Sequence, residues 1–212
     1  MFAVVKMPIM SRFEEQLKGQ MIKRMSIDNP WWRSGTIAED YKAMPKRMYL
    51  DEFYPLITDR SIRRAVILMG PRRVGKTVMI FHAINKLIEE GVNPHKIIYI
   101  SIDTPIYNNH SLEDLFYYAK DALKQPENNE GYYVFFDEIQ YLKNWEVHLK
   151  SLVDTYRNVK FVASGSAAAA LKMKSNESGA GRFTDFMLPP LTFFEYINLQ
   201  KLNTIIVDSS SF

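Results

Sequence analysis

From residue 65 onwards, short hydrophobic runs alternate with segments in which hydrophobic residues recur every three or four positions. A short run is typical of a strand buried on both faces, and the recurring pattern is typical of an amphipathic helix. Strands are therefore expected at residues 65–69, 97–102, 132–136, 160–163 and 182–188. Helices are expected after residue 77, after Ser111 and over residues 145–156. This alternation predicts an α/β fold in which helices cover both faces of a mostly parallel, five-stranded sheet.

A different pattern precedes this region. Residues 11–25 place hydrophobic side chains on one stripe, and Ser11 followed by Glu14 forms a capping-box pattern, so we expect an amphipathic helix that packs on the core or on a partner. Asn29-Pro30 ends that helix. Trp31 and Trp32 follow in a loop, where large aromatic rings are costly to expose. We expect both rings to dock as structural anchors, with stacking on adenine as the alternative.

Composition narrows the classes of protein that fit. The chain has 212 residues, of which 47% are hydrophobic, enough for one substantial core. The 27 basic residues nearly balance the 24 acidic ones, so the charge does not indicate nucleic-acid binding. The absence of cysteine excludes disulfides, thiolate metal sites and a cysteine nucleophile. With no apolar stretch near the roughly 20 residues of a membrane span, we expect a cytoplasmic protein without membrane contact.

The strongest motif lies between the first predicted strand and its helix. It reads Gly70-Pro71-Arg72-Arg73-Val74-Gly75-Lys76-Thr77, the phosphate-binding loop pattern known as Walker A. The glycines let backbone N–H groups surround phosphate oxygens, Lys76 places a cation on the β- and γ-phosphates, and the Thr77 hydroxyl suits Mg²⁺. The helix that continues through Val78 adds its positive N-terminal end. Residues 70–78 are therefore predicted to bind a nucleoside triphosphate. For Arg72 and Arg73, phosphate contact, contact with a facing subunit and solvent exposure all remain open.

Two carboxylates follow the third predicted strand, as in a Walker B motif. Asp137 and Glu138 come directly after an apolar run, at the strand edge where open α/β sheets bind ligands. Asp137 suits a Mg²⁺ ligand, and Glu138 suits a base that orients and deprotonates the attacking water. A solvated turn is the plain alternative, which the phosphate loop some sixty residues earlier disfavours.

Three further polar residues are candidates. Ser164 and Ser166 end the fourth strand, where a hydroxyl can sense the γ-phosphate; Ser166 is equally suited to cap a helix beginning at residue 167. Arg182 follows a small, polar segment at residues 174–181 that we expect to be flexible. It is a candidate arginine finger, acting in its own chain or in a neighbouring subunit, with an exposed ion pair as the alternative. The four histidines lack metal-ligand spacing and receive no catalytic role.

With these residues, the chain resembles the AAA-type P-loop ATPases of bacteria and archaea, specifically the family of predicted ATPases whose core precedes a conserved C-terminal domain of unknown function. The resemblance runs over residues 29–200. Besides the motifs above, it rests on Asn29-Pro30-Trp31-Trp32, Phe136-Asp137-Glu138-Ile139-Gln140, Gly181-Arg182 and Leu188-Pro189-Pro190-Leu191-Thr192-Phe193-Phe194-Glu195-Tyr196.

The resemblance implies a three-layer α/β/α P-loop NTPase fold in which the Ser164 strand separates the Asp137 strand from the phosphate-loop strand. It also implies ATP as the nucleotide, Glu138 as catalytic base, and assembly that brings Arg182 to a neighbour's site. We expect an N-terminal helix and docking segment at residues 1–62, an ATPase core at 63–200 and a tail at 201–212. Since family members continue further, the helical lid and effector region are expected outside this chain.

The expected activity is hydrolysis of ATP to ADP and phosphate with Mg²⁺ and water. A nucleotide-dependent switch with little hydrolysis, which recruits a partner, is the main alternative. A small-molecule kinase fits less well, because an Asp-Glu pair suits activation of water better than transfer to a hydroxyl.

Overall fold

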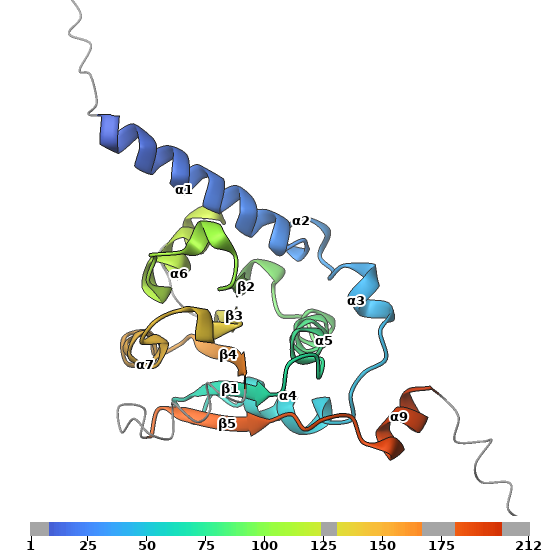
Figure 1. The fold of residues 1–212 in the computed structure, drawn as a ribbon. Coiled ribbons are helices and arrows are strands. Elements are labelled where there is room, and N and C mark those ends of the chain that lie inside the picture. The colour runs from blue at the N-terminus through green and yellow to red at the C-terminus, as the bar shows by residue number, and fades with distance from the viewer. Residues whose placement is uncertain (1–8, 124–130, 167–180, 201–212) are drawn as a thin grey trace, which may run out of the picture.

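The structure is a computed structural model that describes residues 9–123, 131–166 and 181–200, with side chains from residue 14. Five strands form one sheet in the order β2-β3-β4-β1-β5, and every neighbouring pair is parallel (Figure 1). The strands are β1 (Ala65–Gly70), β2 (Ile97–Ser101), β3 (Tyr133–Asp137), β4 (Lys160–Ser166) and β5 (Phe183–Met187). The predicted parallel five-stranded sheet is therefore confirmed, and so is the position of β4, the strand of Ser164, between β1 and β3.

Helices cover both faces of this sheet and complete three layers. Figure 1 shows α5 (Lys76–Glu89) on one side of the strands, and α6 (Leu112–Ala122) and α7 (Trp145–Thr155) on the other. Successive residues of a strand point to opposite faces. Accordingly, Val66 and Leu68 join the core with α5 and α4 (Leu50–Thr58), whereas Ile67 and Met69 join the core with α6 and α7. This double burial explains why β1 is hydrophobic at every position before its final glycine.

Local signals placed the helices of the core correctly. Ser111 and Asp114 form the predicted capping box: the Ser111 hydroxyl accepts from the Asp114 amide, and the Asp114 carboxylate accepts from the Ser111 amide, both at 3.1 Å. The predicted core face of α7 is buried at Trp145, Leu149, Leu152 and Val153. The remaining elements are short: α2 (Trp31–Ser34), α3 (Glu39–Ala43), α9 (Phe193–Leu199), η1 (Pro94–Lys96), η2 (Pro105–Tyr107) and η3 (Ile139–Tyr141).

The first helix, α1 (Ile9–Asp28), is longer than predicted at both ends. Because it begins at Ile9, Ser11 lies inside the helix, and the predicted capping box at Ser11 and Glu14 is wrong. Helix α1 packs against α6 (Figure 1). Met21 and Met25 of α1 are buried, and Lys18 pairs with Asp121 of α6 at 2.7 Å. Thus α1 packs on the core.

The segment after α1 docks on the edge of β2; docking of Trp31 and Trp32 was predicted, but not where they dock. The side chain of buried Asn29 donates to the Tyr99 carbonyl at 2.8 Å and accepts from the Tyr99 amide at 2.7 Å, so it occupies the edge of the strand. Trp31 and Trp32 form the short helix α2 rather than a loop, and both indole N–H groups donate to the Ile97 carbonyl. Trp31 is only 1% exposed, which leaves its ring no free face for adenine. None of the helices within the described ranges combines the length and hydropathy that crossing a membrane requires.

Candidate nucleotide-binding site

Residues 71–75 connect β1 to α5 at the carboxyl end of the sheet. Arg73 (φ +64°) and Gly75 (φ +94°) both adopt the left-handed region, which turns the chain sharply into α5. Lys76 is buried, and its ammonium donates to the carbonyls of Gly70 at 3.1 Å and Pro71 at 2.9 Å. An ammonium has three N–H donors, so these contacts leave one for a phosphate oxygen. Arg72 and Arg73 are exposed.

Asp137, at the end of β3, is the hub of the site and is only 1% exposed. Its Oδ2 accepts hydrogen bonds from the hydroxyls of Thr77 at 2.7 Å and Tyr99 at 2.9 Å. Its Oδ1 accepts from the Ser164 hydroxyl and from the Glu138 amide, the latter at 3.1 Å. Four donors thus hold one buried carboxylate, and they come from α5 and from three neighbouring strands or strand ends.

Tyr99 was not selected from the sequence, where it reads only as one aromatic residue of a buried strand. Burial, and secondarily the charge of Asp137, raises the pKa of Tyr99, so the phenol remains a protonated donor. Tyr99 also lines a cavity of about 510 Å³, together with residues of α1, α3 and α5.

The carboxylate of Glu138 is partly exposed beside this hub. Glu138 has φ +54°, an uncommon conformation for a non-glycine residue, and precedes η3. Its carboxylate accepts from the side-chain amide of Gln140, and the Gln140 oxygen accepts from the Ser166 amide at 3.1 Å. Gln140 therefore links Glu138 to the end of β4. A glutamine after a strand has no chemical signature of its own, so this role of Gln140 was not predicted from the sequence.

The oxygen ligands at Thr77 and Asp137 fit Mg²⁺. Magnesium in nucleotide sites takes one or two protein oxygens together with phosphate oxygens and water. The Thr77 hydroxyl and the Asp137 carboxylate lie within hydrogen-bond distance of each other and supply such a pair. Within the described residues no group of three or more histidine and carboxylate side chains is placed to hold a metal ion.

Two predicted residues are not brought into this cluster as expected. Arg182 lies at the amino end of β5, where its carbonyl accepts from the Ala65 amide and its guanidinium pairs with Asp154 at 2.6 Å. The phosphate loop follows the other end of β1, roughly 16 Å further along the strands. A finger role in its own chain is therefore wrong, and a role in a neighbouring subunit stays a prediction. Ser166 ends β4, while its predicted helix cap and most of the predicted flexible loop lie outside the described residues.

A buried ion pair between Arg47 and Glu195, which was not predicted, lies beside the phosphate loop. Arg47, 7% exposed, donates to the carboxylate of Glu195, to the Val74 carbonyl at 2.6 Å and to the Pro189 carbonyl at 3.0 Å. A cavity of about 340 Å³ adjoins this contact; its lining includes Arg47, Arg72, Val74, Pro190, Leu191 and Leu199. Since Arg47 and Glu195 are 148 residues apart, no local pattern pointed to the pair.

Comparison with known families matches residues 62–197 to the AAA domain family. An uncharacterized protein of Methanocaldococcus jannaschii, MJ1637, is 32% identical over 142 residues, which cover 66% of this chain and 28% of that protein. An uncharacterized protein of Haemophilus influenzae is 25% identical over 171 residues, 76% of this chain and 40% of that protein. The chain thus spans well under half the length of these relatives.

Among solved structures, the Orc1 protein of Aeropyrum pernix, determined in complex with DNA, has a similar fold. The TM-score is 0.52 with 12% sequence identity, and the match covers 76% of this chain and 50% of that protein. At this identity the likeness concerns the fold alone.

Proposed function

Because the chain belongs to the AAA domain family and contains an AAA-type P-loop ATPase core, we propose that it binds ATP with Mg²⁺ and hydrolyses the ATP to ADP and phosphate. The observation that carries the proposal is the 2.7 Å hydrogen bond between Thr77 and Asp137. It joins the start of α5, directly after the phosphate loop, to the end of β3, where Glu138 follows. This supports a site in which the loop binds phosphate and Glu138 activates water.

ATP binding is supported on both sides of the loop. The phosphates would lie against the N–H groups of residues 70–77 and the ammonium of Lys76. The cavity beside Val74 has apolar lining from Pro190, Leu191 and Leu199, which suits the flat face of a base. A nucleoside bound in this cavity would lie next to the phosphate loop.

Catalysis is assigned to the groups at the end of β3. Thr77 and Asp137 would hold Mg²⁺, which when bound neutralises charge on the β- and γ-phosphate oxygens. Glu138 orients a water molecule for in-line attack on the γ-phosphorus and accepts its proton. As the new phosphorus–oxygen bond forms, the bond to the oxygen bridging the β- and γ-phosphates breaks, and ADP departs with that oxygen. Lys76 stabilises the charge on the transferring group.

A single-turnover measurement tests the proposal. Labelled ATP is mixed with an excess of protein in the presence of Mg²⁺, and the release of phosphate is followed over time. The proteins compared are the wild type, Glu138→Gln and the control Glu52→Gln, which removes an exposed carboxylate on α4. We expect release at least about 100-fold slower in Glu138→Gln, since general-base catalysis contributes a factor of this size. Glu52→Gln should match the wild type. Equal rates in the wild type and Glu138→Gln would reject hydrolysis by this site.

A nucleotide-dependent switch is the second candidate, favoured by one contact. The side-chain amide of Gln140 donates to one oxygen of the Glu138 carboxylate, which would restrain the base from turning toward an attacking water. The switch is supported if the wild type and Glu138→Gln both bind ATP tightly and both release phosphate equally slowly.

A further inference from the structure

Arg47 joins three parts of the chain that are distant in sequence. Its guanidinium contacts the phosphate loop at the Val74 carbonyl, the segment after β5 at the Pro189 carbonyl, and α9 at the Glu195 carboxylate. Both members of the ion pair are buried, at 7% exposure for Arg47 and 1% for Glu195. A buried pair of this kind is costly to break, because the remaining partner becomes an uncompensated charge. The three segments are therefore held together as a unit.

The contact at Val74 bears directly on the geometry of the loop. Val74 stands between Arg73 and Gly75, both in the left-handed region, so the direction of its carbonyl is tied to the turn of the loop. In a trans peptide the C=O and the following N–H point in opposite directions. By holding the Val74 carbonyl, Arg47 directs the Gly75 N–H to the opposite side, and loop N–H groups are the groups that surround phosphates in such loops.

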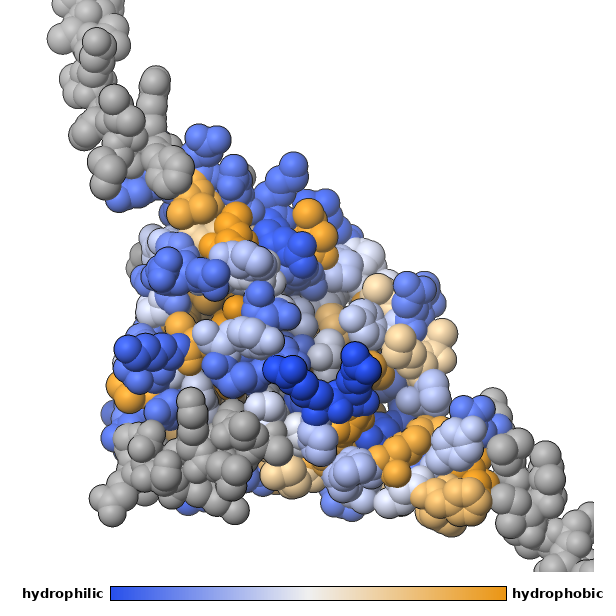
Figure 2. All heavy atoms as spheres, viewed as in Figure 1, coloured by the Kyte–Doolittle hydropathy of each residue, from blue (hydrophilic) through white to orange (hydrophobic). Residues whose placement is uncertain are grey.

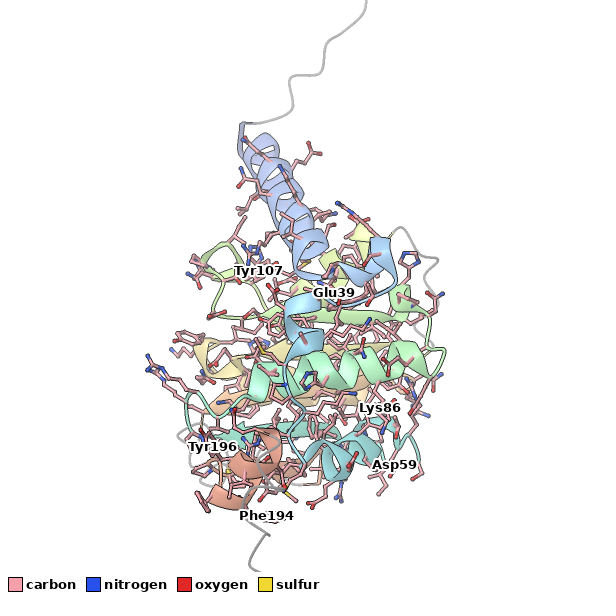
Figure 3. All side chains as sticks on the ribbon, turned by 90° about the vertical axis from the view of Figure 1, so that its right-hand side faces the viewer. Glu39, Asp59, Lys86, Tyr107, Phe194 and Tyr196 are labelled. Atoms are coloured by element: carbon pink, nitrogen blue, oxygen red, sulfur yellow. The ribbon has the colours of Figure 1, made fainter. Side chains whose placement is uncertain are left out.

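At its other end, the same guanidinium holds α9. Glu195 lies in the first turn of this helix, next to Phe194 and Tyr196, which are 65% and 46% exposed. Figure 3 shows these two side chains on α9 at the end of the molecule away from α1, on the same side as the start of α5. In Figure 2 hydrophobic residues are visible at the lower right, where α9 lies in Figure 1. A change in the loop that moves Arg47 would thus displace a helix that carries exposed aromatic side chains.

We propose that Arg47 is a positioning residue for the phosphate loop, and that its pairing with Glu195 couples nucleotide occupancy of the loop to the placement of α9. The inference rests on ATP binding as proposed above. Such coupling is reciprocal. If bound nucleotide stabilises the position of α9, then holding α9 in that position raises the affinity for nucleotide by the same free energy. Disrupting the pair at either residue should therefore weaken ATP binding, because Glu195 acts on the loop through Arg47.

The test combines nucleotide titration with amide hydrogen exchange. A fluorescent ATP analogue with Mg²⁺ is titrated into the wild type, Arg47→Lys, Glu195→Gln and the double variant. Hydrogen exchange of residues 189–199 is then measured with and without ATP. We expect affinity about 10-fold lower in each single variant, and little further loss in the double variant because both changes break one unit. ATP should slow exchange of residues 189–199 in the wild type and not in the variants.

Arg60→Lys is the matched control. Arg60 also joins main-chain carbonyls of separate segments, those of Asn158, Gly131 and Tyr132, but at the amino end of the sheet. Its loss should leave analogue affinity and ATP-dependent exchange unchanged. Should Arg47→Lys fail to fold, the isosteric Glu195→Gln decides the question by the same two measurements.

The outcomes separate the two proposals. A wild type that does not bind the analogue rejects the proposed function, and the coupling with it. A wild type that binds, together with variants that bind equally well or retain ATP-dependent protection of residues 189–199, rejects the coupling alone.

Discussion

The hydroxyl of Tyr99 donates a 2.9 Å hydrogen bond to Oδ2 of Asp137, the oxygen that also accepts the Thr77 hydroxyl. Tyr99 belongs to β2 and Asp137 to the neighbouring strand β3, so the bond fixes the candidate metal ligand from a second strand. Because burial raises the pKa of Tyr99, the phenol remains a donor throughout the pH range in which the protein would work.

Tyr99→Phe is therefore expected to lower the free energy of unfolding by about 1–2 kcal/mol, since a buried carboxylate loses one donor. Urea unfolding in Mg²⁺-free buffer measures the change. Tyr133→Phe is the control: it removes a hydroxyl on the neighbouring strand that accepts a long, 3.4 Å hydrogen bond from Arg60, and it keeps the ring over which Arg60 lies. We expect less than about 0.5 kcal/mol there. Equal losses of unfolding free energy in the two variants would show that the hydrogen bond to Asp137 adds nothing beyond the loss of a tyrosine hydroxyl.

Lys76→Ala should lower ATP affinity about 10- to 100-fold, the usual range for losing a hydrogen bond to a charged group. Calorimetric titration with ATP and Mg²⁺ measures it. Lys86→Ala removes an ammonium from the last turn of the same helix, distant from the loop, where Lys86 lies 4.3 Å from the Tyr54 ring (Figure 3). Lys86→Ala should bind ATP with the affinity of the wild type. If Lys76→Ala also binds with that affinity, Lys76 does not contribute to ATP binding.

The parts of the fold that the sequence predicted are those with strong local signals. The five predicted strands are all present, Ser111 caps its helix, and the glycine spacing of residues 70–77 placed the loop between β1 and α5. Asp137 was placed correctly because a polar residue directly after a buried run must lie at the strand end. These predictions needed no knowledge of the tertiary structure.

Two of the missed residues, Arg47 and Tyr99, make contacts that join segments distant in sequence. Gln140 was missed although its partner Glu138 is only two residues away. Arg47 and Tyr99 carry no local signature, and their roles arise only when α9 and β3 are brought against them. The Ser11 cap failed for a related reason: a Ser-x-x-Glu pattern also occurs inside a helix, and the helical pattern continued toward Ile9. For Arg182, the sequence did not reveal that the residue lies at the amino end of β5, so only the finger role in its own chain was wrong.

Gln140→Met tests how the Glu138 carboxylate is positioned. The variant retains much of the side-chain volume but removes the amide that joins Glu138 to the Ser166 amide. If Gln140 orients the base, single-turnover phosphate release falls about 10-fold while ATP affinity stays within about 2-fold, since the contact acts on the attacking water rather than on the bound nucleotide. Faster release would instead identify the amide as a restraint on Glu138, as the switch hypothesis requires.

His82 gives the fold a predictable dependence on pH. It is buried on α5, and its Nε2 donates to the Tyr41 carbonyl at 2.9 Å. Burial lowers the pKa of His82 below its ordinary value of 6.5. Between the lowered pKa and 6.5 the unfolded chain binds a proton that the folded chain does not, so the associated stability is complete above pH 6.5 and declines as the pH falls.

His82→Gln should therefore show a shallower loss of stability between pH 7.5 and 5.5 than the wild type, by up to about 1 kcal/mol. Urea unfolding at the two pH values gives the comparison. Parallel losses in both proteins would mean that other groups account for the acid sensitivity.

Gly70 and Gly19 offer a matched pair of glycine substitutions with opposite expected signs. A Cβ at Gly70 would lie 2.5 Å from the Leu188 carbonyl oxygen, and the Leu188 backbone is fixed by a 2.7 Å hydrogen bond to Met69. Gly70→Ala should therefore cost about 1–3 kcal/mol of stability and weaken ATP binding, because the start of the loop must move. Gly19 is exposed on α1 with open space around it, so Gly19→Ala should add about 0.5–1 kcal/mol through helix propensity. Urea unfolding and ATP titration of both variants check these expectations. A Gly70→Ala protein as stable as the wild type would mean that β1 and the segment at Leu188 can move apart without a loss of stability.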